Sequence, residues 1–377
     1  MLLPMSADQD LFVETTAKLL DELVPVGELR RLRYDPAGFD GDYWRRGAEL
    51  GWTSLLVSPA DGGGSIGDHG LVDLALVAYE FGRHAAPGPL AVTNVVAATL
   101  SETGHGGDGL VGGLLSGTSL ATWCLGEPRP GDRLGTIALD IRVEGDEVVL
   151  DGAKRPVESA AVADHLLVTG RTGSGLTQVL VPTDTAGVTV APMHSVDMTR
   201  RFSVVTFDGV RLPVSAVIGS IGSSDAQVER QLERALVVAC AESVGAMRTA
   251  FDMTVEWAFD RYSFGRPLAS YQELKHRFAD MKTWLEAGHA VTGAATVAAA
   301  DGSPDTTELL SAAKAFIGDY GSALLQDCIQ IHGGIGLTFD HDVHLYLRRH
   351  TVDRALFGTP AEHRQRLADI ESRVHAA

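Results

Sequence analysis

The segment RYSFGRPL at residues 261–268 places cations and a hydroxyl at a sharp break between two long helical stretches. A glycine and a proline within the segment end the first of these stretches. The guanidinium groups of Arg261 and Arg266 and the hydroxyl of Ser263 could hold an anionic group such as a pyrophosphate. The alternative is structural, because arginines also stabilise the C-terminal end of a helix through its dipole.

A second candidate is the segment QIHGGIGLT at residues 330–338, which has three glycines in four positions after a helical stretch. Glycines let the backbone approach a ligand closely because they carry no side chain. The spacing is not the GxGxxG pattern that follows a strand in dinucleotide-binding Rossmann folds. A glycine that ends the helix and begins a turn would have the same pattern.

A third candidate is the basic stretch formed by Arg348, Arg349, His350 and Arg354. It is a local exception in an acidic chain, and a local pocket can oppose the sign of the net charge. The alternative is a solvated helix face that binds nothing.

The overall charge limits the partners of the chain. Its 377 residues include 31 Lys and Arg against 49 Asp and Glu, a formal net charge of −18. This excess disfavours a broad nucleic-acid interface and a polybasic attachment to anionic lipid. The sequence contains no run of about 18 apolar residues, so it predicts no membrane span. The first 20 residues lack the basic segment with which a signal peptide begins. Three distant cysteines, at positions 124, 240 and 328, predict no metal site and favour buried thiols in a cytoplasmic protein.

The elements that must position these residues fall into three blocks. Helical periodicity in the first block covers residues 10–23, 43–50 and 71–81, with a glycine-rich loop at 60–67. From about residue 120 to 219 the period shortens toward two, which predicts at least six short strands in a small barrel or sandwich. Long helices are expected at 226–260, 272–300 and 308–332. We therefore predict a helical domain at 1–119, a β domain at 120–223 and a second helical domain at 224–377.

Taken together, the segments at 261–268 and 330–338 and the arginine-bearing stretch after them resemble the C-terminal domain of acyl-CoA dehydrogenases. The resemblance extends over nearly the full length, with similar short segments at 61–64 and 210–213. It implies an α+β fold with an N-terminal helical domain, a middle β-barrel or sandwich and a C-terminal four-helix bundle. It also implies a non-covalent FAD that lies between the subunits of a tetramer.

The activity that the resemblance implies is FAD-dependent α,β-dehydrogenation of an acyl-CoA thioester to the 2-enoyl-CoA, in lipid or steroid catabolism. A glutamate removes the α proton and the flavin takes the β hydrogen as hydride. Electron-transfer flavoprotein is then the expected acceptor. By resemblance, the residues that contact the FAD of a neighbouring subunit are Arg261, Ser263, Phe264, Gln272, Gln330, Gly333 and Gly334.

Two segments of the middle block depart from the family pattern. The run of small residues that packs against the flavin is matched here by residues 126–133, which keep Glu127 and Pro128 but place Arg129 where glycine is expected. The tryptophan–isoleucine–threonine segment that flanks the flavin ring is matched by residues 156–158. An indole platform is therefore missing, and Glu158 brings a carboxylate close to the expected flavin position.

The catalytic base also departs from the pattern, because the usual glutamate before a Gly-Thr pair is replaced by Phe357. Glu233, in a Leu-Glu-Arg context, and Glu242, on an otherwise apolar helix face, are the two candidates for a relocated base. Three hypotheses stay open. The chain is an active dehydrogenase in a homotetramer, a partner subunit, or an acyl-CoA-binding or assembly protein without redox chemistry. The partner subunit would complete the FAD site of a sister chain in a heterotetramer, as in the dehydrogenases of actinobacterial steroid breakdown, and would lack its own base.

Overall fold

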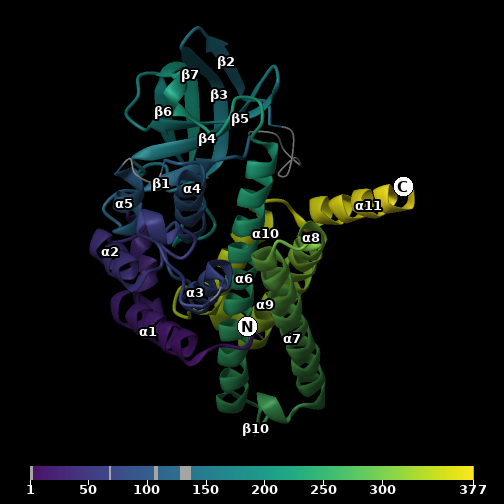
Figure 1. The fold of residues 1–377 in the computed structure, drawn as a ribbon. Helices are drawn as coiled ribbons and strands as arrows, with labels where there is room; N and C mark the ends of the chain where they lie inside the picture. Colours follow the sequence, from purple (N-terminus) through teal and green to yellow (C-terminus); the bar gives the residue numbers. More distant parts are fainter. Residues whose placement is uncertain (1–2, 68, 106–108, 128–136, 377) are drawn as a thin grey trace.

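The computed structural model of the protein describes residues 3–67, 69–105, 109–127 and 137–376. Helices come first, then a sheet, then a second set of helices (Figure 1). This order confirms the predicted α+β fold class. The proposed domain limits of 1–119, 120–223 and 224–377 stay a prediction, although the strands of the large sheet all lie between Ala121 and Ile218.

The N-terminal block has five α-helices, of which the third and the fourth pack against the long helix of the C-terminal block. Its first helix is fixed by a capping box, in which the Ser6 side chain and the Gln9 side chain each accept from the other's backbone amide. The helices are α1 (Ala7–Leu23), α2 (Gly41–Leu50), α3 (Gly70–His84), α4 (Leu90–Glu102) and α5 (Leu110–Leu115), with 3₁₀ turns η1 (Val26–Tyr34) and η2 (Pro59–Asp61).

The middle block is one eight-stranded sheet in the order β6-β7-β3-β2-β4-β5-β8, with β1 paired in parallel to β4. Its core is separate from the core that the two helical blocks share. The strands are β1 (Ala121–Cys124), β2 (Asp140–Glu144), β3 (Glu147–Glu158), β4 (His165–Thr172), β5 (Gly175–Pro182), β6 (Val188–Met193), β7 (Phe202–Pro213) and β8 (Val217–Ile218), with the 3₁₀ turn η3 (Val214–Ala216) before β8.

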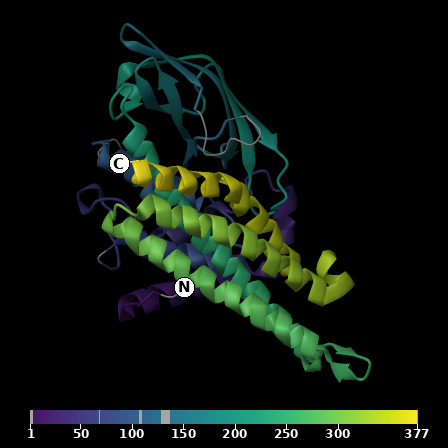
Figure 2. The same cartoon turned by 90° about the vertical axis from the view of Figure 1, so that its right-hand side faces the viewer.

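The C-terminal block is built around α6 (Asp225–Asp260), whose 36 residues span about 54 Å at 1.5 Å per residue. Figure 2 shows α7, α8 and α11 side by side in this block. Its other elements are the hairpin strands β9 (Tyr262–Ser263) and β10 (Arg266–Pro267), η4 (Leu268–Ser270), α7 (Gln272–Asp301), α8 (Thr306–Phe316), η5 (Ile317–Gly321), α9 (Ser322–His332), η6 (Gly333–Leu337), α10 (Val343–Ala355) and α11 (Pro360–Ala376).

Two glycines allow α3 and α6 to touch backbone to backbone. A Cβ at Gly82 would lie 1.9 Å from the Glu242 carbonyl oxygen, and one at Gly245 would lie 2.1 Å from the Tyr79 carbonyl oxygen. Any larger residue would force the helices apart. This contact fixes the N-terminal block against the middle of α6.

The three thiols are free and buried, at Cys124, Cys240 and Cys328. Across the described ranges, no helix is both long and apolar enough to cross a membrane. The same residues contain no group of three or more His, Cys, Asp or Glu side chains arranged to hold a metal ion.

Candidate functional site

Segments that the sequence analysis matched to a flavin site converge where the sheet meets the helices. We call this place the junction pocket. Its free volume is about 40 Å³, which is room for only a few water molecules. Its lining residues are Val92, Trp123, Leu125, Gly126, Glu127, Arg155, Pro156, Glu158, Phe202, Ala355, Leu356 and Phe357.

Two aromatic rings fill one side of the junction pocket. The rings of Trp123 and Phe357 stack with 6.2 Å between centroids and 19° between planes. Trp123 is fixed because its indole N–H donates to Thr169 Oγ1 at 3.0 Å. Phe357 directly follows Leu356, the residue that caps α10, and has a left-handed φ of 56°. The residue in the usual position of the base is therefore an apolar wall of the pocket.

Glu127 survives from the family pattern but has a structural role. Its carboxylate accepts from the buried Lys154 ammonium at 2.8 Å and from the backbone amides of Ala138 and Leu139 at 2.8 Å. Burial alone would raise the pKa of Glu127, but Lys154 and the two amides outweigh it and hold the pKa below its ordinary value. Pro128 and Arg129, which the sequence analysis also named, lie outside the described residues.

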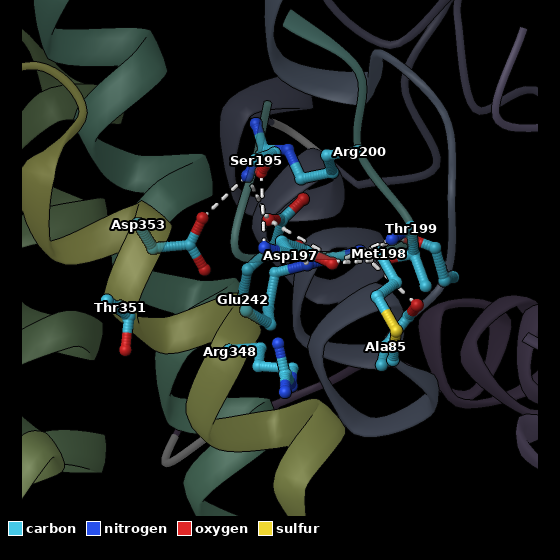
Figure 3. A network of polar contacts seen from close by, with 12 residues as sticks. Ala85, Ser195, Asp197, Met198, Thr199, Arg200, Glu242, Arg348, Thr351 and Asp353 are labelled. Carbon is cyan, nitrogen blue, oxygen red and sulfur yellow. Dashed lines mark hydrogen bonds and ion pairs between the residues drawn. The ribbon is translucent and has the colours of Figure 1, made fainter. Parts of the chain in front are cut away.

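Both carboxylate oxygens of Glu158 are engaged in a buried ion pair. Arg200 donates to it from Nε and Nη2, each at 2.6 Å, which is a bidentate pair with both side chains almost fully buried. Arg200 Nη1 also donates to Asp353 Oδ1 at 2.6 Å and reaches Glu242 Oε2 at 3.4 Å (Figure 3). A side chain next to the expected flavin position thus joins β3 to α6 and α10.

We call the whole group of buried charges around Arg200 the charge cluster. Arg349 extends it through Asp197, with Nε to Oδ2 at 2.7 Å, and lies 3.7 Å from Glu242. The members of the cluster are the cations Arg200, Arg349 and Lys314 and the carboxyl groups Glu158, Asp197, Glu242 and Asp353.

Glu242 is the carboxyl group that leaves the charge cluster unbalanced. Burial raises the pKa of Glu242 to about 8, despite the opposing effect of Arg200. Burial also raises the pKa of Asp353 and lowers that of Lys314. A proton shared between Glu242 and Asp353 reduces the buried negative charge that the arginines must compensate.

The two candidate bases do not line the junction pocket. Glu233 accepts from Thr307 Oγ1 of α8 at 3.1 Å, and its pKa is raised by burial. Glu242 faces the arginines of the charge cluster. Nine residues separate the two on α6, which places them on roughly opposite faces of the helix. Their catalytic roles stay predictions.

The predicted contacts for a neighbour's cofactor lie at the far end of α6, on the β9–β10 hairpin (Figure 1). Arg261 is exposed at the C-cap of α6, Ser263 is half-buried, and Gln272 is exposed at the first turn of α7. Phe264 is 98% exposed and has a φ of 50°, followed by Gly265 at 82°. Positive φ at both central residues is typical of a tight hairpin turn, where a bulky residue is rare. The hairpin therefore holds an aromatic ring out in solvent.

The glycine turn lies at the same end of the molecule as the hairpin. Gln330, Gly333 and Gly334 are exposed at the end of α9 and the start of η6. The ring of His332 stacks on Trp257 of α6 with 5.2 Å between centroids, and Trp257 is one turn before Arg261. The structure therefore brings the two predicted groups together.

The hairpin and the junction pocket are far apart within one chain. From Glu242, which packs in the charge cluster, to Arg261 the helix advances 19 residues, or about 28 Å. The hairpin of this chain therefore does not line its own junction pocket.

Comparisons with known proteins show which family the chain resembles. Residues 225–370 match the family described as "Acyl-CoA dehydrogenase, C-terminal domain". The acyl-CoA dehydrogenase IpdE2 of Mycolicibacterium smegmatis is 29% identical over 96% of this chain and 98% of its own length. The C-terminal block of the chain belongs to the acyl-CoA dehydrogenase family.

Solved structures of acyl-CoA dehydrogenases have the same fold as this chain. A variant of a protein titled "Tcur3481-Tcur3483 steroid ACAD" has a TM-score of 0.88 and 26% identity, over 98% of this chain and 99% of that one. A glutaryl-CoA dehydrogenase from Mycobacterium smegmatis in complex with FADH2 has a TM-score of 0.86 and 20% identity, over 97% and 95% of the two chains. The family consists of FAD-dependent oxidoreductases.

In this chain, the space left inside the junction pocket is too small for a flavin ring unless its side chains move. A tricyclic ring system needs far more than the roughly 40 Å³ left between Trp123, Phe357 and Pro156. Opening the pocket would separate the Trp123–Phe357 stack, and the Glu158 carboxylate beside it is already bound to Arg200. The hairpin and the glycine turn, by contrast, are exposed, and their contact with another subunit's cofactor stays a prediction.

The sequence analysis did not identify several residues that shape the junction pocket and the charge cluster. Arg200 and Asp353 lie 153 positions apart in the chain, and Trp123 is one tryptophan among five. None of them belongs to a short motif. Two signals were available: the Glu158 carboxylate, and Glu242 on an apolar helix face, for which a buried ion pair with an arginine was the alternative to a catalytic role. The structure places Glu242 beside Arg200 and Arg349.

Proposed function

We propose that this chain is one subunit of a heteromeric acyl-CoA dehydrogenase. It supplies the hairpin and the glycine turn to a FAD that an unlike sister chain holds, and it binds no flavin ring in its own junction pocket. The assembly carries out α,β-dehydrogenation of an acyl-CoA thioester to the 2-enoyl-CoA. In this assignment the proton acceptor belongs to the sister chain, because Phe357 stands in the usual position of the base here.

The observation that carries the proposal is the contrast between the two ends of the chain. The junction pocket is closed by the Trp123–Phe357 stack and by the Glu158–Arg200 ion pair. The hairpin, however, presents Arg261 and an almost fully exposed Phe264. Phe259 and Tyr262, close to Phe264 in the chain, are also 64% and 63% exposed. Such a group of exposed apolar rings marks a surface that another molecule covers.

The substrate class that we propose is a steroid-derived acyl-CoA, in a heterotetramer. The support is the similarity to the steroid dehydrogenase whose title names two proteins, at 26% identity over nearly the full length. Electron-transfer flavoprotein is the electron acceptor that we propose, and the three buried free thiols favour the reducing cytoplasm.

The first test is the flavin content of the chain purified alone and incubated with excess FAD. We expect a folded protein without stoichiometric flavin absorption. Co-expression with an acyl-CoA dehydrogenase paralogue encoded beside it should give a yellow complex that contains both chains. One FAD per chain in the protein purified alone would overturn the proposal.

A second test removes one cation from the hairpin. Arg261→Ala should lower the flavin content of the co-purified complex without dissociating it, because Arg261 would hold the cofactor phosphates. Arg230→Ala is the matched control, since Arg230 is exposed near the other end of the same helix. Equal flavin content in the two variants would exclude Arg261 from the site.

A further inference from the structure

A second cavity, which we call the arginine cavity, has a volume of about 400 Å³ and does not contain the Trp123–Phe357 stack. It is lined by the loop 193–201 between β6 and β7, by Arg33 of η1, and by Phe339 and Arg348 near the start of α10. All three blocks of the chain therefore contribute to it. Its size lies within the range of about 300–1,000 Å³ that is typical of small-molecule sites.

The charge of the arginine cavity is strongly positive in a chain of net charge −18. Arg33, Arg200, Arg201 and Arg348 line it together with His194. Asp197 is the one carboxyl group among the described lining residues, and it already accepts from Arg349 at 2.7 Å. Arg200 is balanced by Glu158 and Asp353, so Arg33, Arg201 and Arg348 supply the positive charge that a ligand would meet.

Two of these guanidinium groups have no anionic partner within the described part of the chain. Arg33 makes no hydrogen bond or ion pair there, and it lies over the Phe339 ring at 5.3 Å. Arg348 lies over the same ring at 5.6 Å and donates to neutral groups, His344 Nδ1 at 3.2 Å and the Val196 carbonyl at 3.1 Å. Both guanidinium groups therefore lie against the same ring, and one anion that contacts both would offset their charges.

The geometry selects the chemistry of the anion. Planar guanidinium groups bind phosphate oxygens through paired N–H donors, which makes paired arginines typical of phosphate recognition. The cavity is larger than a bare phosphate requires, and the side chains of Met193, Met198 and the 44% exposed Phe339 offer apolar surface beside the cations. We propose that the arginine cavity binds a nucleoside diphosphate group, with its phosphates between Arg33 and Arg348.

This site is independent of the proposed function, because none of its residues belongs to the hairpin. The heteromer could therefore form even if the arginine cavity bound no ligand. The site also gives a role to one residue of the basic stretch at 348–354. Arg349 and His350 are buried and Arg354 pairs with Asp319, so Arg348 is the member that faces the cavity.

The test is calorimetric titration of the full chain with ADP in a phosphate-free buffer of low ionic strength. We expect saturable binding of ADP and none of adenosine, because the phosphates supply the recognition. Arg33→Gln and Arg348→Gln should each weaken binding about tenfold or more, since each removes a charge-assisted contact. Arg31→Gln is the matched control, because Arg31 lies on the same 3₁₀ turn, is 83% exposed and pairs with Glu28.

Three results would overturn the proposal. ADP could give no heat of binding at about 5 mM. Adenosine could bind as tightly as ADP, which would remove the phosphates from the recognition. The Arg33→Gln protein, whose exposed side chain makes no hydrogen bond in the described structure, could bind ADP as tightly as the Arg31→Gln control. The Arg33→Gln arm therefore keeps the test decisive even if Arg348→Gln disturbs the fold.

Discussion

Arg200→Met tests whether the charge cluster holds the three blocks of the chain together. The substitution removes the cation that binds Glu158 at 2.6 Å through two hydrogen bonds and Asp353 at 2.6 Å through a third. Both carboxylates stay buried. Removing one partner of a buried ion pair costs about 3–5 kcal/mol, because the other charge is left uncompensated. We expect a loss of stability in this range at pH 7.

The pH dependence separates this cause from a simple packing defect. A buried carboxylate that has lost its cation becomes protonated instead, and the free energy of that protonation falls by about 1.4 kcal/mol for each pH unit of acidification. The destabilisation by Arg200→Met should therefore shrink by about 2–3 kcal/mol between pH 7 and pH 5.

Urea unfolding, followed by tryptophan fluorescence and far-UV circular dichroism, measures this effect. Arg211→Met is the control, because Arg211 also pairs with two carboxylates, Glu144 and Glu147, but its side chain is 52% exposed. Its unfolding midpoint should hardly change. Equal midpoint shifts for the two variants, or an Arg200→Met shift that is the same at both pH values, would refute the reasoning.

Three further predictions concern α6 and the junction pocket. Burial raises the pKa of Glu242 from 4.5 to about 8. The stability that its neutral form contributes at low pH is therefore lost as the pH rises between these values. Glu242→Gln should make the urea midpoint of unfolding less dependent on pH over this window. Gly245→Ala should lower the free energy of unfolding by about 1–3 kcal/mol, because the new Cβ would lie 2.1 Å from a carbonyl oxygen of α3. Gly288→Ala on α7 has no contact closer than 3.5 Å and should raise the free energy of unfolding by about 0.5–1 kcal/mol in urea titrations. Phe357→Ala should destabilise the chain by up to about 3 kcal/mol and shift the emission of Trp123, because their stack is lost; unchanged fluorescence would contradict the role of Phe357 as a wall.

Much of the fold was predictable where periodicity and caps agree. The expected helix at 226–260 is α6 (Asp225–Asp260), and the expected helix at 272–300 is α7 (Gln272–Asp301). The sequence analysis did not identify α4 (Leu90–Glu102), because the helix is buried on nearly all sides and so has no polar face. The single helix expected at 308–332 is interrupted by a π-helical turn, Ile317–Gly321, which packs against His350 from a distant part of the chain.

The candidate site was predictable only where it lies in short motifs. The hairpin and the glycine turn are contiguous segments, so their composition could be read directly. The alternative that the basic stretch is a solvated face is wrong for Arg349 and His350, both fully buried, because their partners come from elsewhere in the chain. The ion pair of Glu158 and Arg200 joins residues 42 positions apart, and no periodicity or spacing indicates such a contact.

The asymmetry between the two ends of the chain argues against an assembly of identical copies. In a homotetramer, every hairpin would have to cover a flavin that an identical junction pocket holds, and that pocket has about 40 Å³ of free space. The 98% exposed Phe264, held on a hairpin with positive φ, would then have no cofactor to cover. An unlike partner with an open pocket removes this conflict, because its flavin gives the hairpin a ligand. The charge cluster meanwhile keeps the closed pocket of this chain stable without one.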